Sequence, residues 1–257
     1  MGATRTAAPS VEHVLRSVGW LDFEIGTHRA TRAAPPLEVS NTEAHPRTEY
    51  RSKPPSPPGK TLADLLDQRR SHRSFSARAM SVAELCTVVA PAFTSPAGRP
   101  SCAVPGAIRT ISALAIVNNM VDNDRAPVPP GLYEICPEPF ALTTIRALPF
   151  SEAAASVDTA DISQPAAILL LCLRARSPRR YLNAYELSLL EAGQILQNIA
   201  LTATSAEIGS CVLGSVFDEP LLSITASGVH PQEAARRHGV PIAAVAIGHI
   251  PNDSKTI

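Results

Sequence analysis

The sequence has no net charge, few aromatic residues and no long apolar run. Its 23 Lys and Arg balance 23 Asp and Glu, so electrostatics gives no reason to expect a polyanion such as nucleic acid as a partner. No apolar stretch reaches the roughly 18 residues that a membrane span needs. The first ten residues, MGATRTAAPS, lack the apolar core of a secretion signal. We therefore expect a cytoplasmic protein that binds neither nucleic acid nor a membrane.

Cysteine and histidine form no pattern typical of a disulfide framework or a metal site. The five cysteines are an odd number, no two have CxxC spacing, and Cys136 and Cys172 lie in apolar runs. The seven histidines are scattered without ligand spacing. We expect reduced cysteines and no bound metal.

What the sequence does contain is enough apolar residues for a core, and much proline. Apolar residues make up 45% of the 257 residues. Residues 33–60 contain seven of the 24 prolines, which predicts an extended arm without regular structure. With a helix predicted around residues 11–20, this gives an N-terminal helix and arm over 1–60 and one domain over 61–257.

Three helices are expected in that domain. Residues 61–68 show helical spacing of leucine, and Ser81 followed by Glu84 predicts a capping box at the start of a second helix. The longest helical segment is 183–206, with these residues expected on one side: Leu189, Leu190, Leu196, Ile199 and Ala203.

Strands are expected between and after these helices. Apolar runs predict strands at 110–118, 166–174 and 241–250, and the second run is typical of a central strand covered on both faces. Residues 131–145 predict a hairpin around Pro137-Glu138-Pro139. The order of elements predicts the α+β class rather than a repeating βαβ array.

The first motif that could carry chemistry is Arg69-Arg70-Ser71-His72-Arg73, after the first core helix. If the chain is extended there, positions 69, 71 and 73 point to one face and place two guanidinium groups and a hydroxyl around one anion. The alternative is a solvated basic cluster favoured by the C-terminus of the helix.

Four further features are ambiguous. Four polar residues interrupt the long helix between 191 and 198, either as ligand contacts or as satisfied polar groups of a buried helix. Residues 210–218 form an apolar stretch with a glycine, which we interpret as a loop that can bring N–H groups close to a flat ligand. Residues 100–106 alone indicate a turn, and Tyr181 is either a proton carrier or a packing residue.

Taken in order, these fragments resemble a known family over about residues 61–250. LLDQRRSHRSF is similar to an R-x-S-x-R motif after a helix, RPSCAVPGAI to a PSAGALHP-like loop, and PGLYEICPEPFAL to a PGLYxYDPxxHxL hairpin. RRYLNAYELSLLEAGQILQNIALTA resembles a helix with LLEAGHxxQNL, and IGSCVLGSVFD resembles GLGSCPIGGFD. The family is the nitroreductase-like FMN flavoproteins, in particular the azoline dehydrogenases of thiazole/oxazole peptide biosynthesis (streptolysin- and microcin B17-type).

The resemblance implies a mixed central sheet flanked by helices, in a homodimer with FMN at the subunit interface. It implies that Arg69, Arg70, Ser71 and Arg73 hold the phosphate and ribityl chain, with Lys255 reaching the phosphate. Ser101 and Cys102 would contact the flavin ring from their loop, and Gln197 would contribute from the long helix. Leu213, Gly214 and Ser215 would lie along the isoalloxazine.

For the proton step, the resemblance implies Tyr181, next to Arg180 where the branch has lysine. Arginine stays protonated in proteins, so only Tyr181 can exchange a proton. Other departures from the branch are Gln194 for a histidine, Glu186 for an arginine, and AVPGA at 103–107, where Pro105 removes an N–H.

The implied function is FMN-dependent oxidation of thiazoline or oxazoline rings in a ribosomally made peptide, in a complex with a cyclodehydratase. Two alternatives stay open, since a fold does not fix a function. One is an NAD(P)H-dependent flavin reductase of nitro compounds or quinones. The other is a non-catalytic scaffold subunit of a peptide-modifying complex, which the altered 101–107 loop and Arg180 favour.

Overall fold

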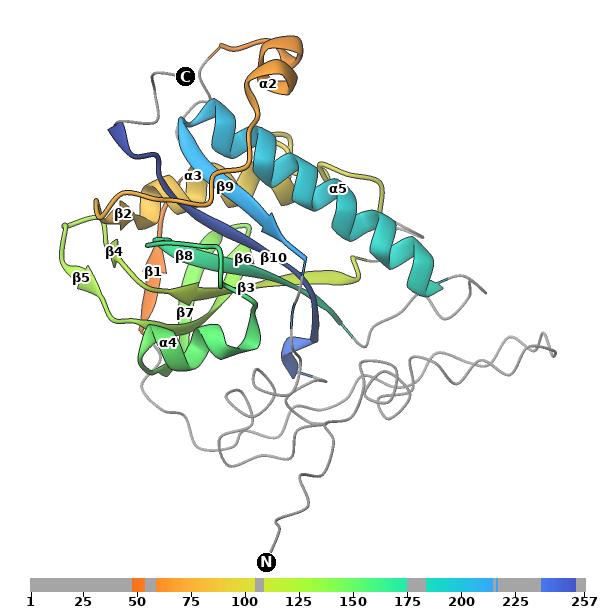
Figure 1. Cartoon of the computed structure of the whole chain (residues 1–257). Coiled ribbons are helices and arrows are strands. Elements are labelled where there is room, and N and C mark those ends of the chain that lie inside the picture. The colour runs from red at the N-terminus through yellow and green to blue at the C-terminus, as the bar shows by residue number, and fades with distance from the viewer. Residues whose placement is uncertain are drawn as a thin grey trace, which may run out of the picture.

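A seven-stranded sheet forms the centre of the molecule, with helices on both faces (Figure 1). The computed structural model describes residues 48–53, 59–104, 109–174, 184–214, 216 and 237–252. In the sheet, the strands follow the order β1-β7-β6-β3-β8-β10-β9. Their bounds are Glu49–Arg51 (β1), Phe140–Ala147 (β7), Gly131–Pro137 (β6), Ile111–Val117 (β3), Ala167–Leu173 (β8), Val240–His249 (β10) and Ile208–Leu213 (β9).

The two central strands show why the apolar runs fold as they do. Every residue of β3 and β8 is buried. Alternate residues of β8 point to opposite faces, so Leu169 and Leu171 join one core cluster and Ile168 and Leu170 join the other. This confirms the prediction of a central strand covered on both faces, and it confirms the strands predicted at 110–118 and 241–250.

The mixed sheet implied by the resemblance is wrong for the described residues. Every neighbouring pair in the seven-stranded sheet is antiparallel. Helix α5 (Ala184–Ser205) connects β8 to β9 and leaves these two strands parallel, but β10 inserts between them, antiparallel to both. A small sheet holds the parallel pair β2 (Met80–Ser81) and β4 (Met120–Val121), with β5 (Pro127–Val128).

One face of the sheet is covered by α3 (Val82–Phe93) and α5. The predicted capping box of α3 is confirmed, since Ser81 Oγ accepts from the Glu84 N–H at 3.1 Å and the Ser81 N–H donates to Glu84 Oε2 at 2.7 Å. The other face is covered by the short helix α4 (Phe150–Ala153), the 3-10 turn Ala154–Ser156 and Phe75.

The exposed side of α5 differs from the prediction. Leu189 and Leu190 are exposed, and the buried residues of the helix are Ser188, Glu191, Ala192, Ile195, Ile199, Ala200, Ala203 and Ser205. The buried stripe advances in steps of three and four residues through 188, 192, 195, 199 and 203, so positions 189 and 190 turn away from it. The predicted helix at 61–68 is confirmed as α2 (Leu62–Gln68), but Leu62 and Leu66 are 63% and 53% exposed.

Two predicted irregular segments contain strands. Residues 49–51, in the arm predicted to lack regular structure, pair with β7, because no proline interrupts them. Residues 208–213, partly predicted as a loop, pair with β10 over six positions. The hairpin is confirmed as β6 and β7, and no described helix is long and apolar enough to cross a membrane. The helix predicted at 11–20 lies outside the described residues, and the domain boundary after residue 60 stays a prediction.

Candidate functional site

Residues 69–76, the edge segment, lie along the outer strand of the sheet. The chain leaves α2 at Arg69, whose φ and ψ are −56° and 123°. Ser71 then bridges Ser210 of β9 in parallel, and the His72 N–H donates to the Ser210 carbonyl at 2.9 Å. The Ser76 N–H donates to the His249 carbonyl at 2.8 Å. The chain is therefore extended after the helix. The prediction of an anion site at positions 69, 71 and 73 assumed this extended conformation.

Phe75 anchors this segment to the face of the sheet that α4 covers, which we call the second face. Its side chain is 3% exposed and packs over two glycines that face each other across β9 and β10, Gly209 and Gly248. A methyl group on Gly248 would lie 3.0 Å from Phe75 Cδ1, and one on Gly209 would lie 3.2 Å from Phe75 Cε1. The glycines therefore provide the room in which the aromatic ring sits.

The side chains of the edge segment expose positive charge. Ser71 and Arg73 are exposed and Arg69 is half-buried. Among the described residues, the guanidinium groups of Arg69 and Arg73 form no hydrogen bond or ion pair. Arg70 instead turns back and donates to the carbonyls of Asp67 and Arg69, the latter at 2.9 Å. Two guanidinium groups without a partner among the described residues, and a hydroxyl, are donors that a phosphate can accept from.

His72 lies on the sheet side of the edge segment. Its Cβ would be 3.2 Å from a methyl group on Gly209, and its Nδ1 is buried without a partner in the described chain. Burial lowers the pKa of His72, which favours the neutral imidazole.

The α3–β3 loop, residues 94–110, rests on the opposite face of the sheet; its residues 105–108 are not described. The end of α3 and the middle of the loop are held by side chains of α5. Asn198 Nδ2 donates to the carbonyls of Ala92 and Ser101 at 3.2 and 3.3 Å, and Gln194 Oε1 accepts from the Ala103 N–H at 3.0 Å. The loop that carries Ser101 and Cys102 is thus fixed by polar side chains of the helix beneath it.

The end of the same loop is held by Glu191. Its Oε2 accepts from Thr110 Oγ1 at 2.7 Å and from the Thr110 N–H at 3.2 Å. The side chain is 0% exposed. Burial raises the pKa of the Glu191 carboxyl, against the opposing effects of the Thr110 hydrogen bonds and the charge of Arg109. Arg109 stacks on the Phe93 ring at 5.3 Å and donates to the Phe93 carbonyl at 2.8 Å.

These contacts explain most of the polar row in α5. Glu191, Gln194 and Asn198 each contact the α3–β3 loop. The alternative of polar groups satisfied within the protein fits Gln194 and Asn198, whereas Glu191 Oε1 has no partner among the described residues. Gln197 is exposed on a different side of the helix. Ser101 and Cys102 are half-buried, and Ser101 Oγ has no partner in the described chain. Burial, with the charge of Glu191, raises the pKa of the Cys102 thiol.

The remaining predicted residues lie at the end of β9 or outside the description. Leu213 is buried in the second-face cluster, and Gly214 is exposed with no atom within 4 Å of an added Cβ. Ser215, Lys255, Arg180 and Tyr181 lie outside the described residues, so the roles predicted for them stay predictions.

A cluster that the motifs did not indicate lies next to the edge segment. Its member His249 accepts the hydrogen bond from the Ser76 N–H through its carbonyl. Glu84 Oε1 lies 3.4 Å from both His249 Nε2 and Arg78 Nη2. Burial would raise the pKa of Glu84, but hydrogen bonds from Ser81 and the charges of His249 and Arg78 lower it. The capping box predicted the contact of Glu84 with Ser81, whereas no sequence signal relates it to His249, 165 residues later.

The predicted cofactor residues therefore form two sets on separate supports. The edge segment and the end of β9 form one set, and Ser101 and Cys102 form the other. In the described part of the chain, no hydrogen bond joins the edge segment to the α3–β3 loop. Figure 1 shows the edge segment passing from α2 along β9, whereas the loop after α3 appears beyond α5.

No family model and no curated protein matches the sequence. Solved structures do match. A Ralstonia eutropha protein assigned as a nitroreductase is 18% identical, with a TM-score of 0.60 over 79% of this chain and 89% of its own. The chain therefore has a nitroreductase-like α+β fold. An Anabaena variabilis protein with the same assignment is 17% identical, with a TM-score of 0.53 over 74% of this chain and 39% of its own.

A third matching structure comes from a synthetase complex. It is a chain of the Escherichia coli microcin synthetase McbBCD complex, solved with truncated pro-MccB17 bound. It is 15% identical, with a TM-score of 0.57 over 97% of this chain and 85% of its own. At this identity the likeness extends to the fold.

Proposed function

We propose that this protein is an FMN-dependent dehydrogenase that oxidises thiazoline or oxazoline rings of a ribosomally made peptide to azoles. The observation that carries the proposal is the extended edge segment on a nitroreductase-like fold. Within the described chain the guanidinium groups of Arg69 and Arg73 have no partner, and Ser71, between them in the sequence, is exposed.

The edge segment suits the phosphate of FMN. Main-chain hydrogen bonds and Phe75 fix the backbone, so the exposed side chains of Ser71 and Arg73 are free to contact an anion. No acidic side chain of the described chain neutralises Arg69 or Arg73. Charge-assisted hydrogen bonds from two planar guanidinium groups are what a phosphate binds best.

The second set of residues favours a homodimer. We propose that the α3–β3 loop of one copy contacts the flavin held by the edge segment of another, since no hydrogen bond of the described residues joins the two sets within one chain. Exposed leucines on α2 and α5, at positions 62, 66, 189 and 190, are typical of subunit contacts. FMN would then lie at the subunit interface.

The chemistry assigned to the protein side chains is proton transfer and orientation. Bound FMN supplies the acceptor for the hydride that leaves one ring carbon of the azoline. The neighbouring carbon, next to a carbonyl, loses a proton, which we assign to Tyr181. Arg180 keeps its charge and orients the substrate. Leu213, Gly214 and Ser215 line the ring, while Gln197 and Lys255 complete the cofactor contacts.

The peptide substrate is supported by the likeness to the microcin synthetase complex, which spans nearly the whole chain and was solved with a propeptide bound. The hairpin GLYEICP–FALTTIRA and the LLEAG stretch of α5 add to this, because they resemble the azoline branch rather than nitroreductases in general. We accordingly propose a cyclodehydratase complex as the partner.

The first experiment is the visible absorption spectrum of the purified protein, followed by identification of the flavin released on denaturation. Flavin bands with stoichiometric FMN are expected. Arg73→Ala should weaken FMN binding about 10- to 100-fold, because it removes a charge-assisted contact. Arg70→Ala is the matched control and should weaken it less, since Arg70 donates to the carbonyls that end α2.

Turnover then separates the remaining functions. Oxidation of an azoline-containing peptide, lost in Tyr181→Phe with FMN retained, would support the dehydrogenase. NAD(P)H-driven reduction of nitro compounds or quinones without azoline oxidation would contradict it. A colourless protein that takes up no added FMN would contradict any flavin enzyme and would support a scaffold subunit of a peptide-modifying complex.

A further inference from the structure

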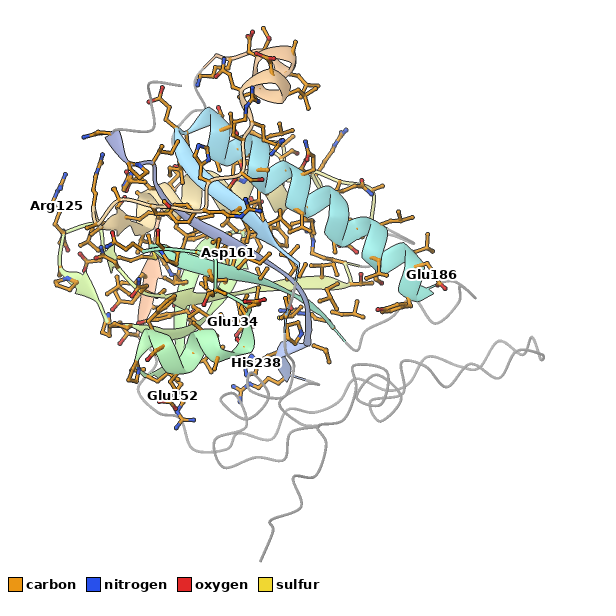
Figure 2. The ribbon with its side chains drawn as sticks, in the orientation of Figure 1. Arg125, Glu134, Glu152, Asp161, Glu186 and His238 are labelled. Carbon is orange, nitrogen blue, oxygen red and sulfur yellow. The ribbon has the colours of Figure 1, made fainter. Side chains whose placement is uncertain are left out.

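Helix α5 carries two carboxylates in opposite environments. Glu186 is exposed at the N-terminal end of the helix, where Figure 2 shows it at the rim of the molecule. Glu191 is fully buried five residues later. A buried carboxyl group costs free energy unless hydrogen bonds compensate it, so the contacts of Glu191 indicate what the residue does.

Those contacts lie where the α3–β3 loop meets β3. Both hydrogen bonds to Glu191 Oε2 come from Thr110, the last residue before β3. The Thr110 carbonyl is itself bound by the Arg174 N–H at 2.8 Å. Gln194 and Asn198 contact Ala103 and Ser101, so the helix holds the loop near its middle and at its end.

Packing alone does not explain a carboxyl group at this position. The second oxygen, Oε1, is buried without a partner in the described chain, as is Arg109 Nη1. An apolar residue would fill the same space between α5 and the sheet without leaving a buried acceptor unsatisfied. The carboxyl group therefore serves the loop rather than the core.

We propose that Glu191 is a positioning residue that fixes the Thr110 end of the α3–β3 loop and, together with Gln194 and Asn198, holds Ser101 and Cys102 where the flavin ring binds. The contact with the flavin rests on the proposed function, whereas the hold on the loop rests on the hydrogen bonds above. Glu191 itself touches neither cofactor nor substrate.

The test compares Glu191→Leu, Glu191→Gln and Thr110→Val with the control Glu186→Leu in the full-length protein. Amide hydrogen exchange of peptides covering residues 99–112, without added FMN, measures the hold on the loop. FMN affinity and turnover at saturating FMN are measured in parallel. Leucine at 191 should speed exchange in this loop about tenfold and weaken FMN binding about tenfold, since it removes both hydrogen bonds.

Glu191→Gln shows whether residue 191 acts through its hydrogen bonds to the loop or only by filling space in the core. Glutamine keeps an oxygen that accepts from Thr110, so it should restore slow exchange and FMN affinity. Turnover at saturating FMN should change little in any folded variant, because the reacting groups are elsewhere. The exposed control should change none of the three.

The outcomes are distinct. Unchanged loop exchange in Glu191→Leu would overturn the proposal, as would equal effects of glutamine and leucine. If Glu191→Leu unfolds, Thr110→Val decides: faster exchange confined to the loop supports the proposal, and unchanged exchange overturns it. Faster loop exchange with unaltered FMN affinity would overturn the link to the flavin. A wild type that binds no FMN would contradict the proposed function, while exchange would still test the hold on the loop.

Discussion

The edge segment and the α3–β3 loop are two irregular stretches that the fold fixes by different means. The edge segment is held by main-chain hydrogen bonds to β9 and β10 and by one aromatic side chain on two glycines. The loop also has main-chain hydrogen bonds, from the Ser101 N–H to the Phe93 carbonyl and from the Arg174 N–H to the Thr110 carbonyl, but polar side chains of α5 add to them, one of them a buried carboxyl group. The first leaves its own side chains free for a ligand, whereas the second depends in part on side-chain contacts that a substitution can remove.

Among these variants, loss of the Phe75 ring should lower the free energy of unfolding most. Phe75→Ala removes a ring that is 3% exposed and leaves a cavity, which costs about 3–5 kcal/mol in the free energy of unfolding. Urea denaturation measures the loss. Phe150→Ala, in a half-buried ring beside the same cluster, is the control and should cost less. Equal losses would contradict a special role of Phe75.

Filling the space under the ring should cost less than removing the ring. In Gly248→Ala the methyl group would lie 3.0 Å from Phe75 Cδ1 and 3.1 Å from the Ala166 nitrogen. Overpacking of this kind costs about 1–3 kcal/mol, measured as a lower midpoint of denaturation. The control is Gly193→Ala in α5, where no atom lies within 4 Å and the helix should gain about 0.5–1 kcal/mol. A stable Gly248→Ala variant would show that the glycine pair is not needed.

Elements specified by neighbouring residues could be predicted from the sequence, whereas elements that depend on distant pairing could not. The capping box of Ser81 and Glu84 and the buried run of β8 are local signals, and both were predicted correctly. Strand β9 was missed because Gly209 and Ser210 are poor strand formers and the strand depends on pairing with β10. The alternation of residues 69, 71 and 73 could be predicted from strand periodicity, but its anchor on Gly209 and Gly248 could not.

The role of Glu191 shows a further limit of sequence reasoning. A glutamate in an otherwise apolar helix is compatible with either burial or exposure. Its environment depends on Thr110, which lies 81 residues earlier in the chain. Glu186 and Glu191 lie five residues apart in α5, on different sides of the helix, and only the packing of the helix shows which side is buried.

Titration of Glu191 should make the loop region less stable as the pH rises. Burial raises the pKa of this carboxyl above the ordinary value of 4.5, so the folded state holds the proton more tightly than the unfolded state. Stability is therefore lost as the pH rises from about the ordinary value through the raised one. Thermal melts of the wild type and Glu191→Gln across that range should diverge, with the wild type falling. Parallel curves would contradict the raised pKa.

Titration of His249 should act on the edge segment in the opposite direction and with a smaller effect. Burial lowers the pKa of His249 below the ordinary value of 6.5, although Glu84 partly opposes this, so the unfolded state binds the proton more readily. Stability is lost as the pH falls from about 6.5 toward the lowered value. The difference in melting temperature between the wild type and His249→Gln isolates this group from other histidines. Because Glu84 stabilises the charged imidazole, Glu84→Gln should enlarge the loss, and a smaller loss would show that burial does not control the titration.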